Sequence, residues 1–263
     1  MNTHKQAPKP ISRRKALITL GALSALGALS TMLHGCGGSG GSDDITATST
    51  VNTTDSTNTT GSTDTIDSCT LIPEETEGPY PLSSVLSNSA IVRSDITEGK
   101  TGVPLTLTLK LVDVNNSCAA IANASVYIWH CDKDGVYSGY NQPGGNTLGE
   151  TFLRGIQDVN GNGEVSFTTI YPGWYNGRIT HIHFQVYLYS SSVATATSQI
   201  AFPQDVTIDV YNSSLYAARG QNTSVTSFSQ DNVFSDGAAY QMATVDGDVN
   251  NGFVATLTVG IAA

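Results

Sequence analysis

The stretch Thr180-His-Ile-His-Phe-Gln-Val-Tyr-Leu-Tyr189 decides the fold, because polar and apolar residues alternate along it. Side chains two positions apart lie on the same face of a β-strand. One face of this strand is apolar and is expected to enter a core: it carries Ile182, Phe184, Val186 and Leu188. The other face carries His181, His183, Gln185, Tyr187 and Tyr189. The alternation predicts a strand at the mouth of a β-sandwich, with two imidazoles pointing the same way.

Four other stretches alternate in the same manner: Val103–Val112, Ser125–His130, Gly163–Ile170 and Gly252–Ile261. Turn sequences such as Asp134-Gly135, Asn160-Gly161 and Pro172-Gly173 separate these stretches. No stretch has a convincing helical period of more than two turns. The pattern predicts an all-β fold, a β-sandwich of mainly antiparallel strands with long connecting loops.

Residues 1–36 have the features of an export signal. Ser12-Arg13-Arg14-Lys15 is a twin-arginine pattern, and an apolar run from Ala16 to Leu33 follows it. A membrane-spanning helix is the alternative, but Ala, Gly, Ser and Thr make the run marginal as a span. Leu33-His34-Gly35-Cys36 resembles a lipobox, so either a lipid anchor at Cys36 or cleavage nearby and release would follow. We expect export by the twin-arginine route to the periplasm or the cell surface.

The remaining organisation follows from composition. Residues 37–66 consist of Gly, Ser, Thr, Asp and Asn with almost no apolar side chains, and they predict a flexible linker. Residues 67–263 are then the folded domain. After residue 36 the chain has 7 Lys and Arg against 22 Asp and Glu. Such an acidic chain should be repelled by nucleic acid and by anionic lipid surfaces, so we expect no nucleic-acid partner.

Three cysteines remain after Cys36. Cys69 and Cys118 both flank predicted strands in loop-like sequence. An oxidising compartment would allow a disulfide, and we expect it between these two. Cys131 follows a strand beside His130 and is expected to be a buried thiol. His130 itself has two interpretations, a residue supporting a metal site or a hydrogen-bonded residue at a strand end, and the second is favoured.

Two tyrosines complete a candidate metal site with His181 and His183. Tyr137 follows the turn Asp134-Gly135, and Tyr175 lies six residues before His181 in Pro172-Gly173-Trp174-Tyr175. A phenol ionises near pH 10, and a bound cation can lower that pKa far enough to make it a ligand at neutral pH. Fe(III) prefers anionic oxygen, whereas zinc and copper favour thiolate and imidazole. Two phenols with two imidazoles therefore predict non-haem Fe(III).

Other metal sites fit the sequence less well. His-x-His alone is a weak pattern, and a copper or zinc sandwich protein stays an alternative. Asp158-Val-Asn160-Gly-Asn162-Gly163 matches the start of an EF-hand loop, but Thr169 stands where a Glu is required and strands flank the segment. We interpret that segment as a turn.

Several stretches together resemble the intradiol ring-cleavage dioxygenases, the family that contains the catechol and protocatechuate dioxygenases. The resemblance runs through most of residues 69–205 and is carried by Thr70–Tyr80, Val126–Tyr137, Phe152–Gly155, Phe167–Tyr175 and Arg178–His183. It is strongest to an exported branch with a twin-arginine leader. The helical N-terminal dimerisation segment of the catechol enzymes has no evident counterpart, which leaves the oligomeric state open.

The resemblance implies an enzyme that cleaves a catechol-type ring between its two hydroxyls with O2 and gives a cis,cis-muconate-type product. It implies Fe(III) held by Tyr137, Tyr175, His181 and His183. Tyr175 would leave the metal and accept a substrate proton, and Arg178 would stabilise negative charge on the ring. Gln199, in Thr197-Ser-Gln-Ile-Ala-Phe202, matches a glutamine beside the substrate.

The main alternative is a non-catalytic secreted β-sandwich that binds phenolic or glycan ligands. The accepted ring substituents are not evident from the sequence. Trp174, Tyr80 and Ile179 are candidate walls of the substrate cavity, and each could equally be a packing residue.

Overall fold

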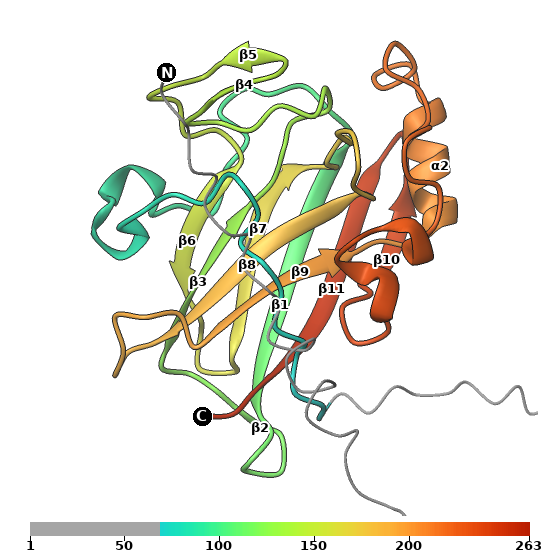
Figure 1. The fold of residues 1–263 in the computed structure, drawn as a ribbon. Coiled ribbons are helices and arrows are strands. Elements are labelled where there is room, and N and C mark those ends of the chain that lie inside the picture. Colours follow the sequence, from blue (N-terminus) through green and yellow to red (C-terminus); the bar gives the residue numbers. More distant parts are fainter. Residues whose placement is uncertain (1–68) are drawn as a thin grey trace, which may run out of the picture. The chain divides into compact units, whose positions relative to one another are not determined.

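Two β-sheets pack face to face in the computed structural model, which describes residues 69–263 (Figure 1). The predicted export signal, the predicted linker and Cys36 lie outside the described residues. One sheet has the order β10 (Thr244–Asp248), β11 (Gly252–Ile261), β1 (Pro104–Asp113) and β2 (Ala119–Ala120), and β7 (Glu164–Ile170) also pairs with β1. The other has the order β6 (Arg154–Asp158), β3 (Ala124–Trp129), β8 (His181–Leu188) and β9 (Ala196–Ala201).

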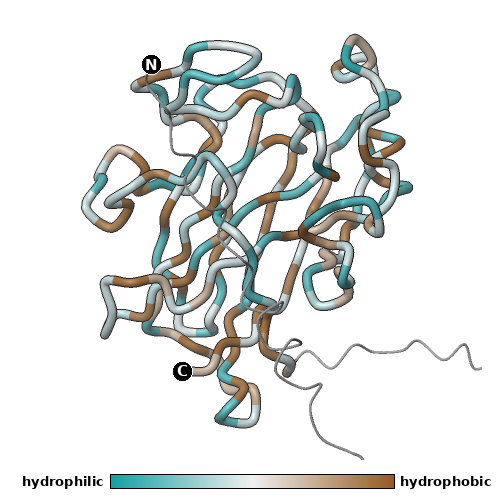
Figure 2. Tube along the Cα trace, viewed as in Figure 1, coloured by the Kyte–Doolittle hydropathy of each residue, from teal (hydrophilic) through white to brown (hydrophobic). Residues whose placement is uncertain are grey.

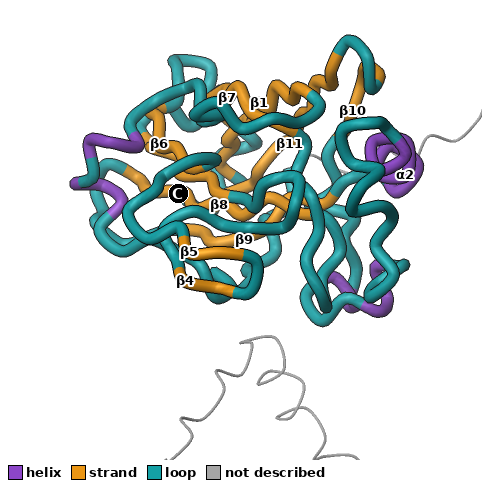
Figure 3. The backbone as a smooth tube through the Cα atoms, turned by 90° about the horizontal axis from the view of Figure 1, so that it is seen from above, coloured by secondary structure: helices purple, strands orange, loops and turns teal. Residues whose placement is uncertain are grey.

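The remaining elements are short. β4 (Asn141–Gln142) and β5 (Gly145–Asn146) form a small hairpin. A helix, α2, spans Gln204–Asn212, and four 3-10 turns span Val85–Ser87, Ser89–Ile91, Phe228–Gln230 and Phe234–Asp236. Figure 3 shows the two strand layers from above, with α2 beside β10 and β11.

The predicted all-β sandwich is confirmed, and each of the five predicted strands is present within about one residue of its expected ends. All the strand pairs are antiparallel except β1 with β11, which run parallel. The sequence did not predict α2. Val206, Thr207, Ile208 and Val210 are β-branched and favour strands, so the local preference opposes the helix that the fold imposes.

The main core lies between the sheets, where apolar residues from both pack together. Figure 2 shows hydrophobic segments alternating with more polar ones along the strands. Ile182, Phe184 and Val186 of β8 are fully buried there, as the alternation predicted. Burial of such side chains contributes about 1.5–3 kcal/mol each and fixes the register of β8, because a slip by one residue would exchange its two faces.

The opposite face of β8 is also covered. β8 is an inner strand between β3 and β9, and His181, His183, Gln185 and Tyr187 are all buried. The loop before the first 3-10 turn contributes to this cover, because Gly78 packs over His183 and the Glu77 carboxylate accepts a hydrogen bond from Gln185. Within residues 69–263, no helix is long and apolar enough to cross a membrane.

The predicted disulfide is present and joins Cys69 to Cys118. Cys131 is a buried free thiol, also as predicted, and burial raises its pKa. The segment that resembles an EF-hand is a turn between β6 and β7, in which the Asn160 side chain accepts hydrogen bonds from the backbone of Asn162 and Glu164.

Candidate active site

The two histidines lie at the start of β8 on the outer face of the four-stranded sheet. Strand pairing places Trp129 of β3 and Gln199 of β9 on either side of His183. Residues directly opposite each other in an antiparallel pair share a face, so Trp129, His183 and Gln199 form one row across the sheet. The rings of Trp129 and His183 stack with centroids 4.7 Å apart.

The two tyrosines reach the histidines from loops. Tyr137 follows the turn after β3, and its hydroxyl lies 3.5 Å from His181 Nε2. Tyr175 belongs to the loop before β8, and its hydroxyl lies 3.2 Å from the same nitrogen. His183 Nε2 lies 3.1 Å from His181 Nε2. The structure thus brings all four predicted ligand rings around one point.

The histidine tautomer directs a lone pair at this point. His181 Nδ1 lies 2.6 Å from the carbonyl oxygen of Ile179, so Nδ1 carries the ring proton and donates a hydrogen bond to that oxygen. His181 Nε2 is then an acceptor. Burial lowers the pKa of His181 and of His183 well below the ordinary value, so both imidazoles are neutral, as metal ligands must be.

The phenols depend on a cation for their charge. Burial raises the pKa of Tyr137 well above its ordinary value and raises that of Tyr175 to about 12. Neither is a phenolate at neutral pH without a strong positive partner. Metal–ligand bonds of about 2 Å place neighbouring ligand atoms about 3 Å apart, which matches the observed spacing. The four residues therefore fit a metal ion that prefers anionic oxygen and imidazole.

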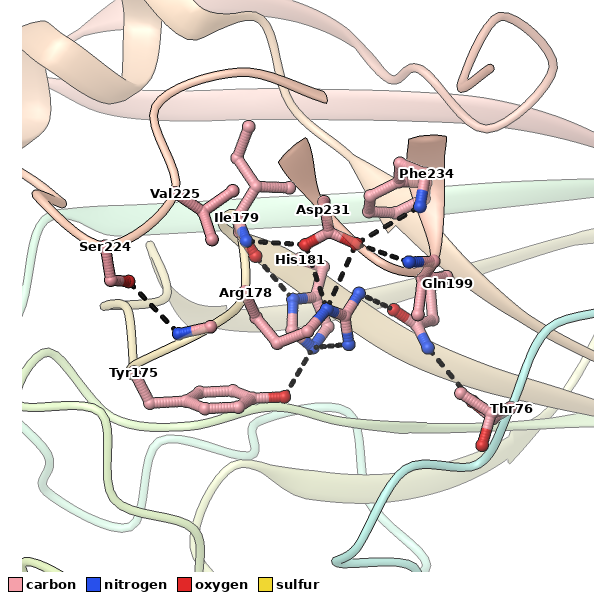
Figure 4. A network of polar contacts seen from close by, with 12 residues as sticks. Thr76, Tyr175, Arg178, Ile179, His181, Gln199, Ser224, Val225, Asp231 and Phe234 are labelled. Atoms are coloured by element: carbon pink, nitrogen blue, oxygen red, sulfur yellow. Dashed lines mark hydrogen bonds and ion pairs between the residues drawn. The ribbon is translucent and has the colours of Figure 1, made fainter. Parts of the chain in front are cut away.

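Arg178 lies beside the four rings, and all three of its guanidinium nitrogens have partners (Figure 4). Nη1 lies 3.4 Å from His181 Nε2, and Nη2 donates to Gln199 Oε1 at 2.6 Å. Nε donates to the carboxylate of Asp231 at 2.9 Å. Gln199 in turn donates from Nε2 to the carbonyl oxygen of Thr76 at 2.9 Å. Both predicted polar residues, Arg178 and Gln199, are thus next to the candidate metal site.

Asp231 is a residue that the sequence analysis missed. It is fully buried and accepts further hydrogen bonds from the backbone nitrogens of Ile179, Val233 and Phe234. No motif surrounds it, and it lies 53 residues from Arg178, so no local pattern could have linked the two.

Gly78 was also missed, although it lies in a stretch that carried the resemblance. Its φ of +70° lies in the left-handed region that favours glycine, and a Cβ there would lie 3.1 Å from His183 Cε1. The loop backbone at Gly78 therefore closes directly over a histidine of the candidate site.

The three candidate wall residues differ in their surroundings. Tyr80 stacks on Tyr137 with centroids 4.8 Å apart, so it covers the site. The Trp174 indole donates to Gly220 and packs under Arg219. Ile179 packs in an apolar cluster with Val225 and Phe234.

The hydrogen bonds of His130 are made to residues other than the four candidate ligands. Its Nδ1 lies 2.8 Å from the Cys131 carbonyl oxygen and its Nε2 lies 2.7 Å from the Thr169 hydroxyl. Both nitrogens have partners in a fully buried setting, which favours the interpretation as a hydrogen-bonded residue at a strand end.

Comparison with known proteins gives the class of this fold and site. The protein-family model described as Dioxygenase matches residues 76–246, and the chain belongs to that family. An intradiol ring-cleavage dioxygenase from Tetranychus urticae superposes with a TM-score of 0.64 at 31% identity, covering 73% of this chain and 95% of that one. The chain is accordingly a member of the intradiol ring-cleavage dioxygenases, as the sequence resemblance predicted.

Two further structures are similar. A second dioxygenase structure has a TM-score of 0.63 at 31% identity, covering 73% of this chain and 94% of that one. A hydroxyquinol 1,2-dioxygenase from Pseudomonas putida has a TM-score of 0.51 at 15% identity, covering 73% and 66%, and shares the fold. A search of curated proteins gave no significant match.

Proposed function

We propose that this protein is a non-haem Fe(III) enzyme that cleaves a catechol-type ring between its two hydroxyls. The reaction adds both atoms of O2 to the ring carbons and gives a cis,cis-muconate-type dicarboxylate. The observation that carries the proposal is the convergence of Tyr137, Tyr175 and His183 on His181 Nε2, at 3.1–3.5 Å. Family membership supports the reaction class.

Tyr137, Tyr175, His181 and His183 would hold the ion. Two phenolates would neutralise two of its three charges and favour the ferric state. When bound, ferric iron would withdraw electron density from a catechol ring and make it reactive toward O2. Because the phenols are neutral when the site has no cation, metal binding releases their protons.

Tyr175 is the better candidate for a base. It is half-buried, whereas Tyr137 is fully buried and stacked against Tyr80. A substrate that displaced the Tyr175 oxygen would leave a phenolate ready to take a proton from a substrate hydroxyl. Arg178 faces the same point, and its permanent charge would stabilise negative charge on the substrate ring. Asp231 and Gln199 hold Arg178 in that direction.

The proposal is tested by colour and by turnover. We expect the purified iron-loaded protein to be wine-red from tyrosinate-to-iron charge transfer, and Tyr137→Phe to weaken that absorbance, because Tyr175 remains as a phenolate donor. With catechol, oxygen uptake and muconate absorbance should rise together. A colourless protein with one iron per chain would refute the ligand set. Catechol binding with neither signal would indicate a non-catalytic binding module, and zinc or copper at full occupancy would indicate the other metal class.

We also propose that residues 1–36 direct export by the twin-arginine route, with lipidation at Cys36. The Cys69–Cys118 disulfide supports a destination outside the reducing cytosol. Replacing Arg13 and Arg14 by Lys should leave the protein in the cytoplasm. Cys36→Ser should release it from membranes after export, and unchanged fractionation of that variant would contradict the anchor.

A further inference from the structure

The loop segment Thr76–Gly78 lies against the candidate active site and is fixed at each of its three residues. The Thr76 carbonyl accepts from Gln199, and the Glu77 carboxylate accepts from Gln185 Nε2 at 2.9 Å. Gly78 packs over His183. Each contact is made to the outer face of β8 or β9, so the segment has a defined position beside the metal-ligand rings.

Glu77 therefore carries a negative charge close to the site. Gln185 lies two residues after His183 on the same face of β8, about 6.6 Å along the strand. Gln185 is buried and also accepts a hydrogen bond from the Tyr187 hydroxyl, so its amide is oriented with its NH2 group toward Glu77. The Gln185 amide, on the strand that carries His181 and His183, thus holds the exposed Glu77 carboxylate in place.

A pocket of about 580 Å³ opens at the same position. Gln185 and Tyr187 line it, together with the apolar residues Leu82, Val85 and Leu86. Among the described residues that line it, Glu77 is the one charged residue. The volume is in the range of pockets that bind organic ligands. Gln185, which lines the pocket, lies on the same face of β8 as His183, so the pocket is next to the candidate metal site.

The charge in this pocket is not cancelled by Arg178. The guanidinium of Arg178 is paired with the buried carboxylate of Asp231. An ammonium group in the pocket would be attracted to Glu77, and a carboxylate group would be repelled by it.

We propose that Glu77 is a specificity-determining residue, which favours catechols whose substituent ends in a protonated amine and disfavours those ending in a carboxylate. This inference rests on the proposed function and adds the substrate class to it. The distinction is one of charge, so substrates of equal arm length should differ in kcat/KM and in affinity.

The test compares three catechols in the iron-loaded protein. They are unsubstituted catechol, 4-(2-aminoethyl)catechol and 3-(3,4-dihydroxyphenyl)propionate, of which the last two carry opposite charges on two-carbon arms. We expect wild-type protein to prefer the amine over the acid, and Glu77→Gln to reduce that preference by about threefold to thirtyfold. The amide introduced by Glu77→Gln keeps an oxygen that can accept the hydrogen bond from Gln185, so the contact between the loop and β8 can persist. Glu74→Gln removes the same charge from an exposed residue three positions earlier and should leave the preference unchanged.

Affinities measured by calorimetry without O2 give a second readout that does not need turnover, and they should show the same change of preference. Equal preference in wild type and Glu77→Gln, or a wild-type preference for the acid, would overturn the inference. If every variant cleaves unsubstituted catechol while the preference stays fixed, only this inference fails. If none cleaves catechol but the calorimetric preference depends on Glu77, the proposed reaction fails and the charge selectivity stands.

Discussion

The buried carboxylate of Asp231 accepts a hydrogen bond from Arg178 Nε at 2.9 Å, although 53 residues separate the two in the chain. The same carboxylate accepts hydrogen bonds from the backbone nitrogens of Ile179, Val233 and Phe234. Asp231 thus joins the loop at residues 222–238 to the segment that leads into β8, the strand that carries both histidines, and it fixes the direction of Arg178.

Asp231→Asn should destabilise the protein strongly, because it leaves the buried Arg178 charge without its partner. We expect a loss of about 3–5 kcal/mol in the free energy of unfolding, together with a lower kcat. Chemical denaturation followed by fluorescence measures the first and oxygen uptake the second. Lys133→Ala, which breaks the more exposed pair of Lys133 with Asp134, is the control and should cost at most about 1 kcal/mol. Similar losses in both variants would contradict the role given to Asp231.

Gly78→Ala should impair metal retention as well as stability. The new methyl group would strain a backbone with a φ of +70° and would press on His183 at 3.1 Å. Gly99→Ala is a matched control, because Gly99 has a φ of +75° and no atom within 4 Å of its added Cβ. We expect both variants to lose about 1–2 kcal/mol of stability from the backbone alone. Iron content and charge-transfer absorbance should fall in Gly78→Ala and stay unchanged in Gly99→Ala. If they stay unchanged in both variants, the loop backbone has moved to accommodate the methyl group and the prediction is wrong.

Reduction of the Cys69–Cys118 disulfide should destabilise the domain. The bond closes a loop with a sequence separation of 49 residues and restricts the unfolded chain, so its loss should cost about 2–4 kcal/mol. Thermal unfolding with and without dithiothreitol measures the effect as a lower Tm. A double Cys→Ser variant at both positions should have that lower Tm without reductant and should not respond to it. A wild-type Tm that is insensitive to complete reduction would contradict the prediction.

His130 should make the stability depend on pH. Burial lowers its pKa from about 6.5 to about 4. The folded-state pKa is the lower one, so between these values the unfolded chain binds a proton that the folded protein does not. Stability attributable to this residue is therefore full above about pH 6.5 and is lost as the pH falls toward 4.

The measurement is the free energy of unfolding of metal-free protein between pH 7 and pH 4.5. His130→Gln should reduce the slope by up to about 1.4 kcal/mol per pH unit, which is the contribution of one proton. His181 and His183 contribute a slope of the same sign in both proteins, because burial lowers their pKa values too. An unchanged slope in the variant would show that His130 does not remain neutral in the folded protein.

The sequence by itself determined the fold class, the main strands and the four rings that meet. Alternation at period two is a local property, and it assigned Ile182, Phe184 and Val186 to the core and both histidines to the other face. The motifs around Tyr137 and Tyr175 supplied the remaining ligand types. The disulfide partners were also predicted, because Cys69 and Cys118 both flank strands in loop-like sequence.

Only the tertiary structure decided what surrounds those rings. The partnership of Asp231 with Arg178, the closure of Gly78 over His183 and the contact of Glu77 with Gln185 each join segments far apart in the chain. No local periodicity encodes such contacts, because they depend on how the covering loops fold back on the sheet. The same holds for α2, whose β-branched residues favour strand locally and become helical in the packed fold.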